Sequence, residues 1–221
     1  MQANATRLIR KMRGGAQAHL LECDDGHFYV VKFRNNAQHR RILINEWIAS
    51  VFLNYLQIST PPAAIVSLSA AFLEANPDIY IQLGSRHQAV EPGRHFGSRY
   101  PGDPGKVMVY DFLPDTLLDK VINAGQFLGI LAFDKWMSNV DARQSIFFRA
   151  ELRQRPTAGG NPAPRAGFVS QMMDHGYVFD GSHWRLSDSP LQGLYLRTNV
   201  YQSVRGWEDF QPWLDRVVHF P

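Results

Sequence analysis

The chain has 221 residues, of which 45% are hydrophobic and 19% are charged. This length favours one domain or two closely packed lobes, and this composition excludes an intrinsically disordered protein. The net charge of +3 is too small for a dedicated nucleic-acid-binding protein, so direct nucleic-acid binding is not expected. The single cysteine, Cys23, excludes an intrachain disulfide and a cysteine-based metal centre.

One uncharged stretch, from residue 47 to 73, is long enough to cross a membrane. Polar residues and the adjacent Pro61 and Pro62 interrupt it, so we do not expect it to span one. The N-terminus also lacks the apolar core of a secretory signal. We therefore expect a soluble, cytoplasmic protein with no membrane partner.

The first half of the chain is predicted to form an antiparallel sheet with one helix. Two apolar runs flank an Asp-Asp-Gly turn, which indicates a β-hairpin over residues 18–33. Apolar residues then recur at helical spacing over 44–56. Two further strands are predicted at 63–68 and 78–83, and the Gly-, Pro- and His-rich region 84–105 is predicted to be a loop.

The second half is predicted to be mainly helical. Residues 115–138 carry an apolar helical face, and residues 207–218 form a final helix in which a proline marks the start. Between them lies a second hairpin, with strands at 145–149 and 167–173. Its connection, 150–166, contains prolines and two adjacent glycines and is expected to be mobile.

A short turn of small residues precedes the first predicted hairpin. It comprises Gly14, Gly15, Ala16 and Gln17, after Arg13. Glycines there allow backbone N–H groups to approach a phosphate closely, which would suit nucleotide binding. A flexible N-terminal turn with no ligand is the alternative.

Lys32 ends the second strand of that hairpin, on the face shared by Phe28 and Val30. A lysine on a covered face needs an anionic partner, because an unpaired buried ammonium is costly. Glu46, 14 residues later in the predicted helix, can supply it. Kinases use such a strand lysine and helix glutamate to hold nucleotide phosphates, whereas a solvated lysine without a partner is the alternative.

Two aspartates lie at element ends in the second half. Asp141 sits in a predicted loop between Asn139 and Gln144, which suits a group that accepts a hydroxyl proton beside a metal ion. Asp174 leaves an apolar strand into an Asp-His-Gly turn and would be a hard oxygen ligand for Mg²⁺. Ordinary turn and capping networks are the alternatives for both, and Asp134 is interpreted as structural.

The order of these features is that of a protein-kinase-like phosphotransferase. With YVVKF at residues 29–33 and the Asn-x-Asp-x-Arg stretch, residues 13–185 resemble the HipA-like kinases. The resemblance implies an α+β, two-lobed protein-kinase-like fold over residues 1–221, with a β-rich N-lobe at 1–100 and a mainly helical C-lobe at 101–221. Residues 93–100 follow the last predicted strand of the N-lobe, where a kinase hinge would lie, and an ordinary exposed loop is the alternative.

The resemblance further implies a role for each matched residue. ATP and Mg²⁺ would be the cofactors, and the glycine turn Gly14–Gln17 would bind the nucleotide. Lys32, paired with Glu46, would position phosphates. Asp141 would be the catalytic base and Asp174 a metal ligand. The acceptor would be a hydroxyl group, with a protein serine or threonine favoured, and an antitoxin-like partner is compatible with the family.

The chain departs from the family pattern at two places. The asparagine expected five residues after the catalytic aspartate is Ile146, so Gln144 or, second, Asn139 would have to serve as the other metal ligand. The serine expected before the glycine turn is replaced by Lys11-Met12-Arg13, so the autophosphorylation switch of HipA toxins is not expected. The competing interpretation is a pseudokinase, a nucleotide-binding or protein-interaction module without turnover.

Overall fold

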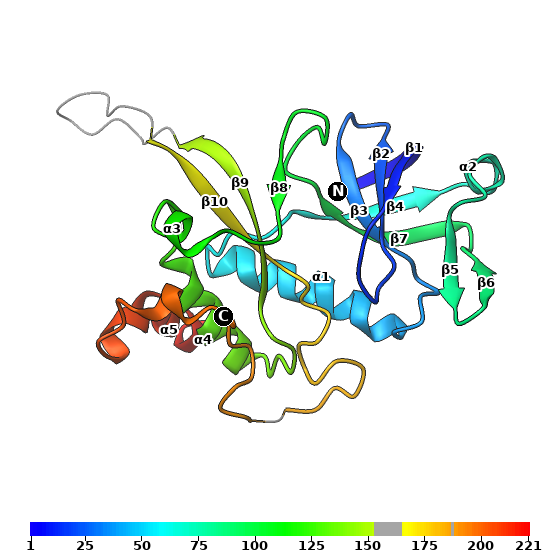
Figure 1. Cartoon of the computed structure of the whole chain (residues 1–221). Coiled ribbons are helices and arrows are strands. Elements are labelled where there is room, and N and C mark those ends of the chain that lie inside the picture. Colours follow the sequence, from blue (N-terminus) through cyan, green and yellow to red (C-terminus); the bar gives the residue numbers. More distant parts are fainter. Residues whose placement is uncertain (153–164, 187) are drawn as a thin grey trace.

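The computed structural model describes residues 1–152, 165–186 and 188–221 (Figure 1). The strands are β1 (Gln2–Lys11), β2 (His19–Cys23), β3 (Phe28–Lys32), β4 (Ala63–Leu68), β5 (Tyr80–Leu83), β6 (Arg86–Ala89), β7 (Gly93–Arg99), β8 (Val109–Tyr110), β9 (Gln144–Leu152) and β10 (Arg165–Met173). The helices are α1 (Arg40–Tyr55), α2 (Ala70–Ala75), α3 (Asp115–Leu118), α4 (Gln126–Trp136) and α5 (Gln211–Val218), with 3-10 turns at Thr198–Tyr201 and Trp207–Phe210. The connection predicted to be mobile, 150–166, lies largely outside the described residues.

The first half of the chain closes into a five-stranded barrel in the order β1-β2-β3-β7-β4. The β2–β3 hairpin is the predicted one, and its register pairs His19 with Val31. The prediction missed β1, whose mixed polar and basic sequence hides its alternation. Gln2–Asn4 of β1 pair in parallel with β4, so the expectation of a purely antiparallel sheet is also wrong.

The region 84–105 is not a loop as predicted, because it contains β6 and β7. β7 pairs with both β3 and β4 and so lies inside the barrel wall. Its sequence has few β-formers, and the packing requires a small residue at one of its positions. A Cβ on Gly97 would lie 2.6 Å from the Val66 side chain, so only glycine fits there.

Helix α1 connects the barrel to the second half of the molecule. The His39 side chain caps its start by accepting the Arg41 N–H at 3.1 Å. Figure 1 shows α1 running from beneath the barrel toward α4. Its buried residues near the C-terminal end, such as Ala49 and Leu53, pack with α4 and β9 residues, including Phe133 and Phe147.

The second half is less helical than predicted. The predicted helical stretch 115–138 is broken between α3 and α4, and β8, β9 and β10 form a three-stranded antiparallel sheet. The β9–β10 hairpin is the predicted second hairpin, with Ile146 opposite Gln171. Pro212 lies in the first turn of α5, as predicted.

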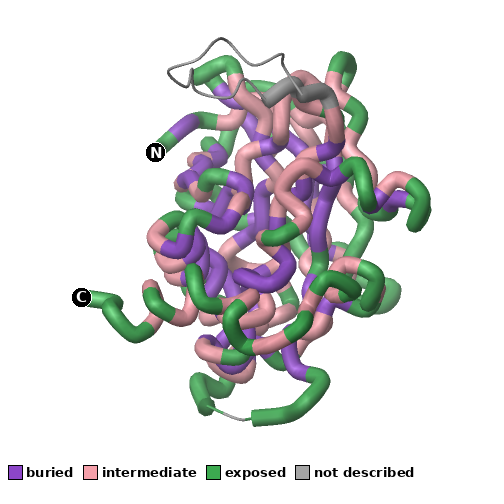
Figure 2. Tube along the Cα trace, turned by 90° about the vertical axis from the view of Figure 1, so that its left-hand side faces the viewer, coloured by how far each residue is buried: buried purple, intermediate pink, exposed green. Residues whose placement is uncertain are grey.

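Two hydrophobic clusters stabilise the fold. One fills the barrel and is built around Tyr29, Val31, Phe33 and Val66. The other is formed by α1, α4, β9 and β10. Figure 2 shows that the buried residues form the interior of the molecule. The fold class is therefore α+β, and no helix within the described residues is long and apolar enough to cross a membrane.

Candidate active site

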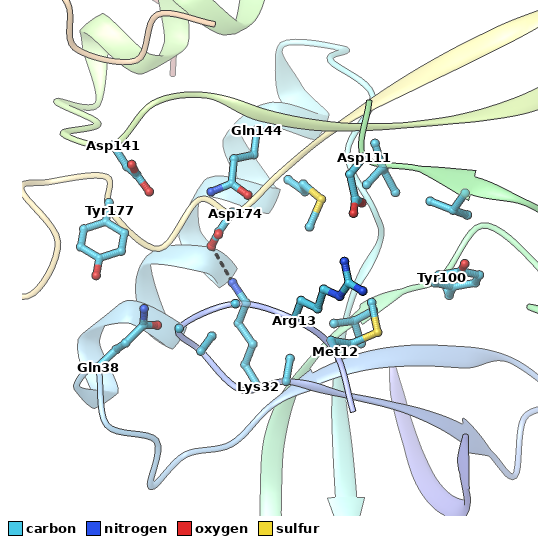
Figure 3. Close-up of a pocket in the computed structure, with 18 of the residues that line it drawn as sticks. Met12, Arg13, Lys32, Gln38, Tyr100, Asp111, Asp141, Gln144, Asp174 and Tyr177 are labelled. Atoms are coloured by element: carbon cyan, nitrogen blue, oxygen red, sulfur yellow. Dashed lines mark hydrogen bonds and ion pairs between the residues drawn. The ribbon is translucent and has the colours of Figure 1, made fainter. Parts of the chain in front are cut away.

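A cavity of about 650 Å³ collects most of the residues that the sequence singled out. Its walls come from the β1–β2 turn, β3, the residues before β9 and the end of β10. Figure 3 shows Asp141 and Tyr177 at one end, Tyr100 at the other, and Lys32 and Asp174 between them. Segments far apart in the sequence thus meet around one space large enough for a small-molecule ligand.

Lys32 lies between two carboxylates. Its Nζ forms an ion pair with Glu46 and a second one with Asp174, at 2.8 Å. The predicted pairing of Lys32 with Glu46 is confirmed. Burial would lower the pKa of Lys32, but the two carboxylates together raise it above its ordinary value. Lys32 is therefore held as a cation, with its charge at the wall of the cavity.

Asp174 is the more exposed of the two carboxylates, since 30% of its side chain is accessible against 3% for Glu46. Burial acts to raise the pKa of Asp174, but the charge and hydrogen bond of Lys32 hold that pKa below its usual value. Asp174 is ionised at neutral pH. Its carboxylate lines the cavity and can therefore accept a cation or a hydrogen bond there.

Two α1 residues fix the backbone that carries Asp174. Glu46 accepts the N–H of His175 at 3.1 Å with its second oxygen. Asn45 donates to the carbonyl oxygens of Gly176, Val178 and Gly181 at 2.8–2.9 Å. Asp174 has a φ of 60°, a left-handed conformation that these contacts help to hold. Asn45 was not predicted as a site residue, because an asparagine inside an amphipathic helix gives no local signal.

The glycine turn contributes three residues to the cavity wall, namely Gly14, Gly15 and Ala16. Gly14 has a φ of 112°, which a residue with a side chain rarely adopts. Gln17, predicted as the fourth member, points elsewhere. Its amide exchanges two hydrogen bonds with the Gln82 backbone, at 2.7 and 2.8 Å, and so anchors the turn to β5.

Asp141 lines the cavity from the loop before β9. One carboxylate oxygen accepts the Ala142 N–H at 2.8 Å, and the Asp141 N–H donates to the Asn139 side chain at 3.2 Å. Asn139 is fully buried and donates to Asp134 at 2.9 Å. Asn139 is thus not among the cavity-lining residues, and it holds the loop rather than facing a ligand.

Arg143 ties the Asp141 loop to the Asp174 loop. Both it and Asp134 are buried, and the guanidinium binds the Asp134 carboxylate with two nitrogens. Its third nitrogen donates to the Met173 carbonyl at 2.7 Å and to His175 Nδ1 at 2.9 Å. This network agrees with the structural role predicted for Asp134. It sets the spacing between Asp141 and Asp174.

Gln144 and Ile146 also line the cavity. Gln144 is exposed and, within the described residues, its amide has no hydrogen-bond partner. Ile146 is buried in β9 and offers no ligand atom. Asp174 and Gln144 supply the carboxylate and amide oxygens that Mg²⁺ accepts in sites completed by phosphates and water. The residues present therefore fit the metal that the resemblance implies, and Gln144 fits it better than Asn139.

The cavity residues that were not predicted as site residues include Arg13, Gln38, Asp111 and Tyr177. Asp111 directly follows the short strand β8, a position typical of functional groups, and this signal was available in the sequence. Tyr177 directly follows the Asp-His-Gly turn, so the sequence could have predicted it as a site residue. Gln38 gives no such signal, since it lies in an irregular segment before α1.

His175 should make stability pH-dependent. Burial, with the charges of Arg143 and Lys32, lowers the pKa of this 3%-exposed residue well below 6.5, so it is neutral when folded. Below about pH 6.5 the unfolded chain takes up a proton that the folded chain refuses, so the free energy of unfolding falls as pH falls. We expect His175→Gln to reduce this slope by up to about 1.4 kcal/mol per pH unit between about pH 5 and 6.5.

The measurement is urea unfolding at several pH values. His19 and His95 also have lowered pKa values, but they contribute equally to both proteins. The exposed His183→Gln is the matched control for removing a histidine. An unchanged slope in His175→Gln would contradict the proposed neutral, buried state of His175.

One comparison with known proteins, a match to a family, agrees with the resemblance. A sequence profile described as HipA-like kinase matches residues 5–148, well over half of the chain. No curated protein matches the sequence. Among solved structures, a crystal structure of the Golgi casein kinase with Mn/ADP bound is similar, with 11% identity and a TM-score of 0.45 over 99% of this chain and 67% of that chain. The matched segment contains the glycine turn, Lys32, Glu46 and Asp141, and it shows that the chain belongs to the HipA-like kinase family.

Proposed function

We propose that this chain is an ATP- and Mg²⁺-dependent kinase that transfers the γ-phosphate to a hydroxyl group, with a protein serine or threonine as the acceptor. One observation carries the proposal. Lys32 is ionised between Glu46 and Asp174 at the wall of a cavity that also contains the glycine turn and Asp141. This combination supplies a fixed cation, close backbone approach and a carboxylate base around one space.

Each residue has a stated part in the proposed reaction. Gly14, Gly15 and Ala16 bind phosphate oxygens through the backbone, and Lys32 positions them electrostatically. Asp174, with Gln144, would hold Mg²⁺, which when bound neutralises phosphate charge. Asp141 accepts the proton of the acceptor hydroxyl. At the same time the hydroxyl oxygen bonds to the γ-phosphorus, and ADP leaves. We further propose that the barrel half, 1–100, and residues 101–221 act as two lobes around the nucleotide.

A nucleotide-binding pseudokinase is the second candidate, and Ile146 is the observation that favours it. This buried side chain occupies the place of an expected metal ligand. The two candidates differ in one measurable quantity, transfer of labelled γ-phosphate from ATP to any protein, including the chain itself. We place the protein in the cytoplasm in either case, and an antitoxin-like partner is compatible with both.

Nucleotide binding is tested by thermal unfolding. Mg-ATP at about 100 times its dissociation constant should add about 2.7 kcal/mol to the free energy of unfolding, a rise in Tm of about 5–10 °C. Lys32→Met should lose most of this rise, because it removes the cation that binds phosphate. Each protein is compared with and without Mg-ATP, so any baseline destabilisation by the substitution cancels.

Lys106→Met is the matched control, since Lys106 is 82% exposed and lies outside the cavity. It should keep the full rise in Tm. A wild-type Tm that does not respond to saturating Mg-ATP would refute the nucleotide site.

A further inference from the structure

A second cavity, also of about 650 Å³, adjoins the first one. The two share six lining residues: Arg10, Met12, Arg13, Asp111, Gln144 and Met173. Figure 3 shows Arg13 extending into the shared region, with Asp111 and Gln144 across from it. A molecule seated in the second cavity would therefore border the place proposed for ATP.

The two cavities differ in charge. Lys32, Arg10 and Arg13 balance three aspartates in the first cavity. The second cavity is lined by five basic residues and one acidic residue, Asp111. Arg10 and Arg13 line both cavities, so their positive charge lies at the border between the proposed ATP site and the second cavity, where it would favour an anionic ligand.

Three of the five basic residues already have partners. Arg143 binds Asp134, Arg197 forms an ion pair with Asp115, and Lys11 lies over the ring of Tyr80 at 4.7 Å from its centre. Arg10 and Arg13 are different. Both are exposed, and within the described residues neither forms an ion pair. These two arginines are therefore available to bind a ligand.

The strand that carries Arg10 offers backbone groups as well. β1 pairs with β2 as far as Lys11, but it pairs with β4 only along Gln2–Asn4. From Ala5 to Lys11 its second edge has no strand partner among the described residues. An unpaired strand edge can bind an extended peptide through main-chain hydrogen bonds. This edge ends at two residues that line the second cavity, which favours a peptide over a small anion.

We propose that the second cavity is the acceptor subsite and that it binds an extended peptide in which acidic residues flank the hydroxyl-bearing residue. Arg10 and Arg13 would pair with the acidic side chains of the peptide. Asp111 is a single carboxylate and does not neutralise both arginines. The inference rests on the proposed kinase function, because it names the class of acceptor for that reaction. In this proposal the two arginines bind the flanking residues of the peptide and do not touch the reacting atoms. Their role is therefore to determine which peptide is bound.

The test compares three peptides of equal length, with a central serine flanked by glutamates, by lysines or by alanines. We expect kcat/KM for the acidic peptide to exceed that for the basic one at least about tenfold. Arg13→Glu and Arg10→Glu should each reduce this ratio about tenfold, because a like charge then faces the acidic peptide. Because each ratio compares two peptides with the same protein, any effect of a substitution on ATP binding cancels.

Arg86→Glu is the matched control. Arg86 is exposed in β6, forms no ion pair within the described residues and lines neither cavity. Reversing its charge should leave the ratio unchanged, since exposed charges are largely screened beyond about 8 Å at physiological ionic strength.

Three outcomes would overturn the inference. The first is a wild-type ratio near one. The second is a higher KM for ATP in Arg13→Glu with an unchanged peptide ratio, which would make Arg13 a nucleotide-binding residue. The third is transfer to a phosphorylated sugar but to no peptide.

Failure of the kinase proposal itself is distinguishable. If the wild type transfers phosphate to no acceptor, the same peptides are labelled and their binding is measured by fluorescence anisotropy with Mg²⁺ and a non-hydrolysable ATP analogue. Tighter binding of the acidic peptide, weakened by Arg13→Glu but not by Arg86→Glu, would support the subsite. Equal binding of the acidic and basic peptides would refute it.

Discussion

Asp141→Asn should lower the rate of phosphate transfer about a thousandfold while nucleotide binding stays close to that of the wild type. Asparagine keeps the size of the side chain and can still accept the Ala142 N–H, so the loop should retain its shape. What it loses is the ability to accept a proton in the transition state. The measurement is kcat for labelled phosphate transfer, together with the Tm rise on adding Mg-ATP.

Asp174→Asn should behave differently from Asp141→Asn. A metal ligand acts in the ground state as well as in the transition state, so we expect it to lose Mg²⁺-dependent nucleotide affinity along with transfer. It also removes one of the two carboxylates that hold Lys32. Equally small effects of the two substitutions on affinity and transfer would mean that both aspartates are ordinary turn residues.

Arg143→Met should destabilise the fold by about 3–5 kcal/mol. It leaves the fully buried Asp134 carboxylate without its cation, and Asn139 alone cannot compensate that charge. It also removes the donors that hold Met173 and His175. The free energy of unfolding is measured by urea denaturation at pH 7.

Two comparisons make this prediction specific. The double variant Arg143→Met with Asp134→Leu should recover part of the loss, because no buried charge then remains unpaired. Arg7→Ala breaks an exposed ion pair and should cost less than about 1 kcal/mol. If Arg143→Met cost no more than Arg7→Ala, the buried pair would have no stabilising role.

The sequence by itself determined the elements whose signals are local. The β2–β3 hairpin follows from an Asp-Gly turn between apolar runs, α1 from helical spacing, and the β9–β10 hairpin from two strand-like runs. The pairing of Lys32 with Glu46 was also predictable, since Lys32 ends one strand and Glu46 lies in the helix that follows it. In these cases the partners lie close in sequence, and a period of two or of 3.6 residues encodes which face is covered.

Only the tertiary structure decided the features that join distant segments. Barrel closure pairs β1 with β4, and β7 was missed because its place in the barrel requires Gly97 rather than typical strand residues. The Lys32–Asp174 ion pair spans 142 residues, and no local pattern encodes it. Asn139 and Gln144 look alike as amide ligands in the sequence, yet Asn139 is buried against Asp134 and Gln144 lines the cavity. Side-chain direction in an irregular loop depends on the partners that packing brings to it, so it is fixed only when the whole chain has folded.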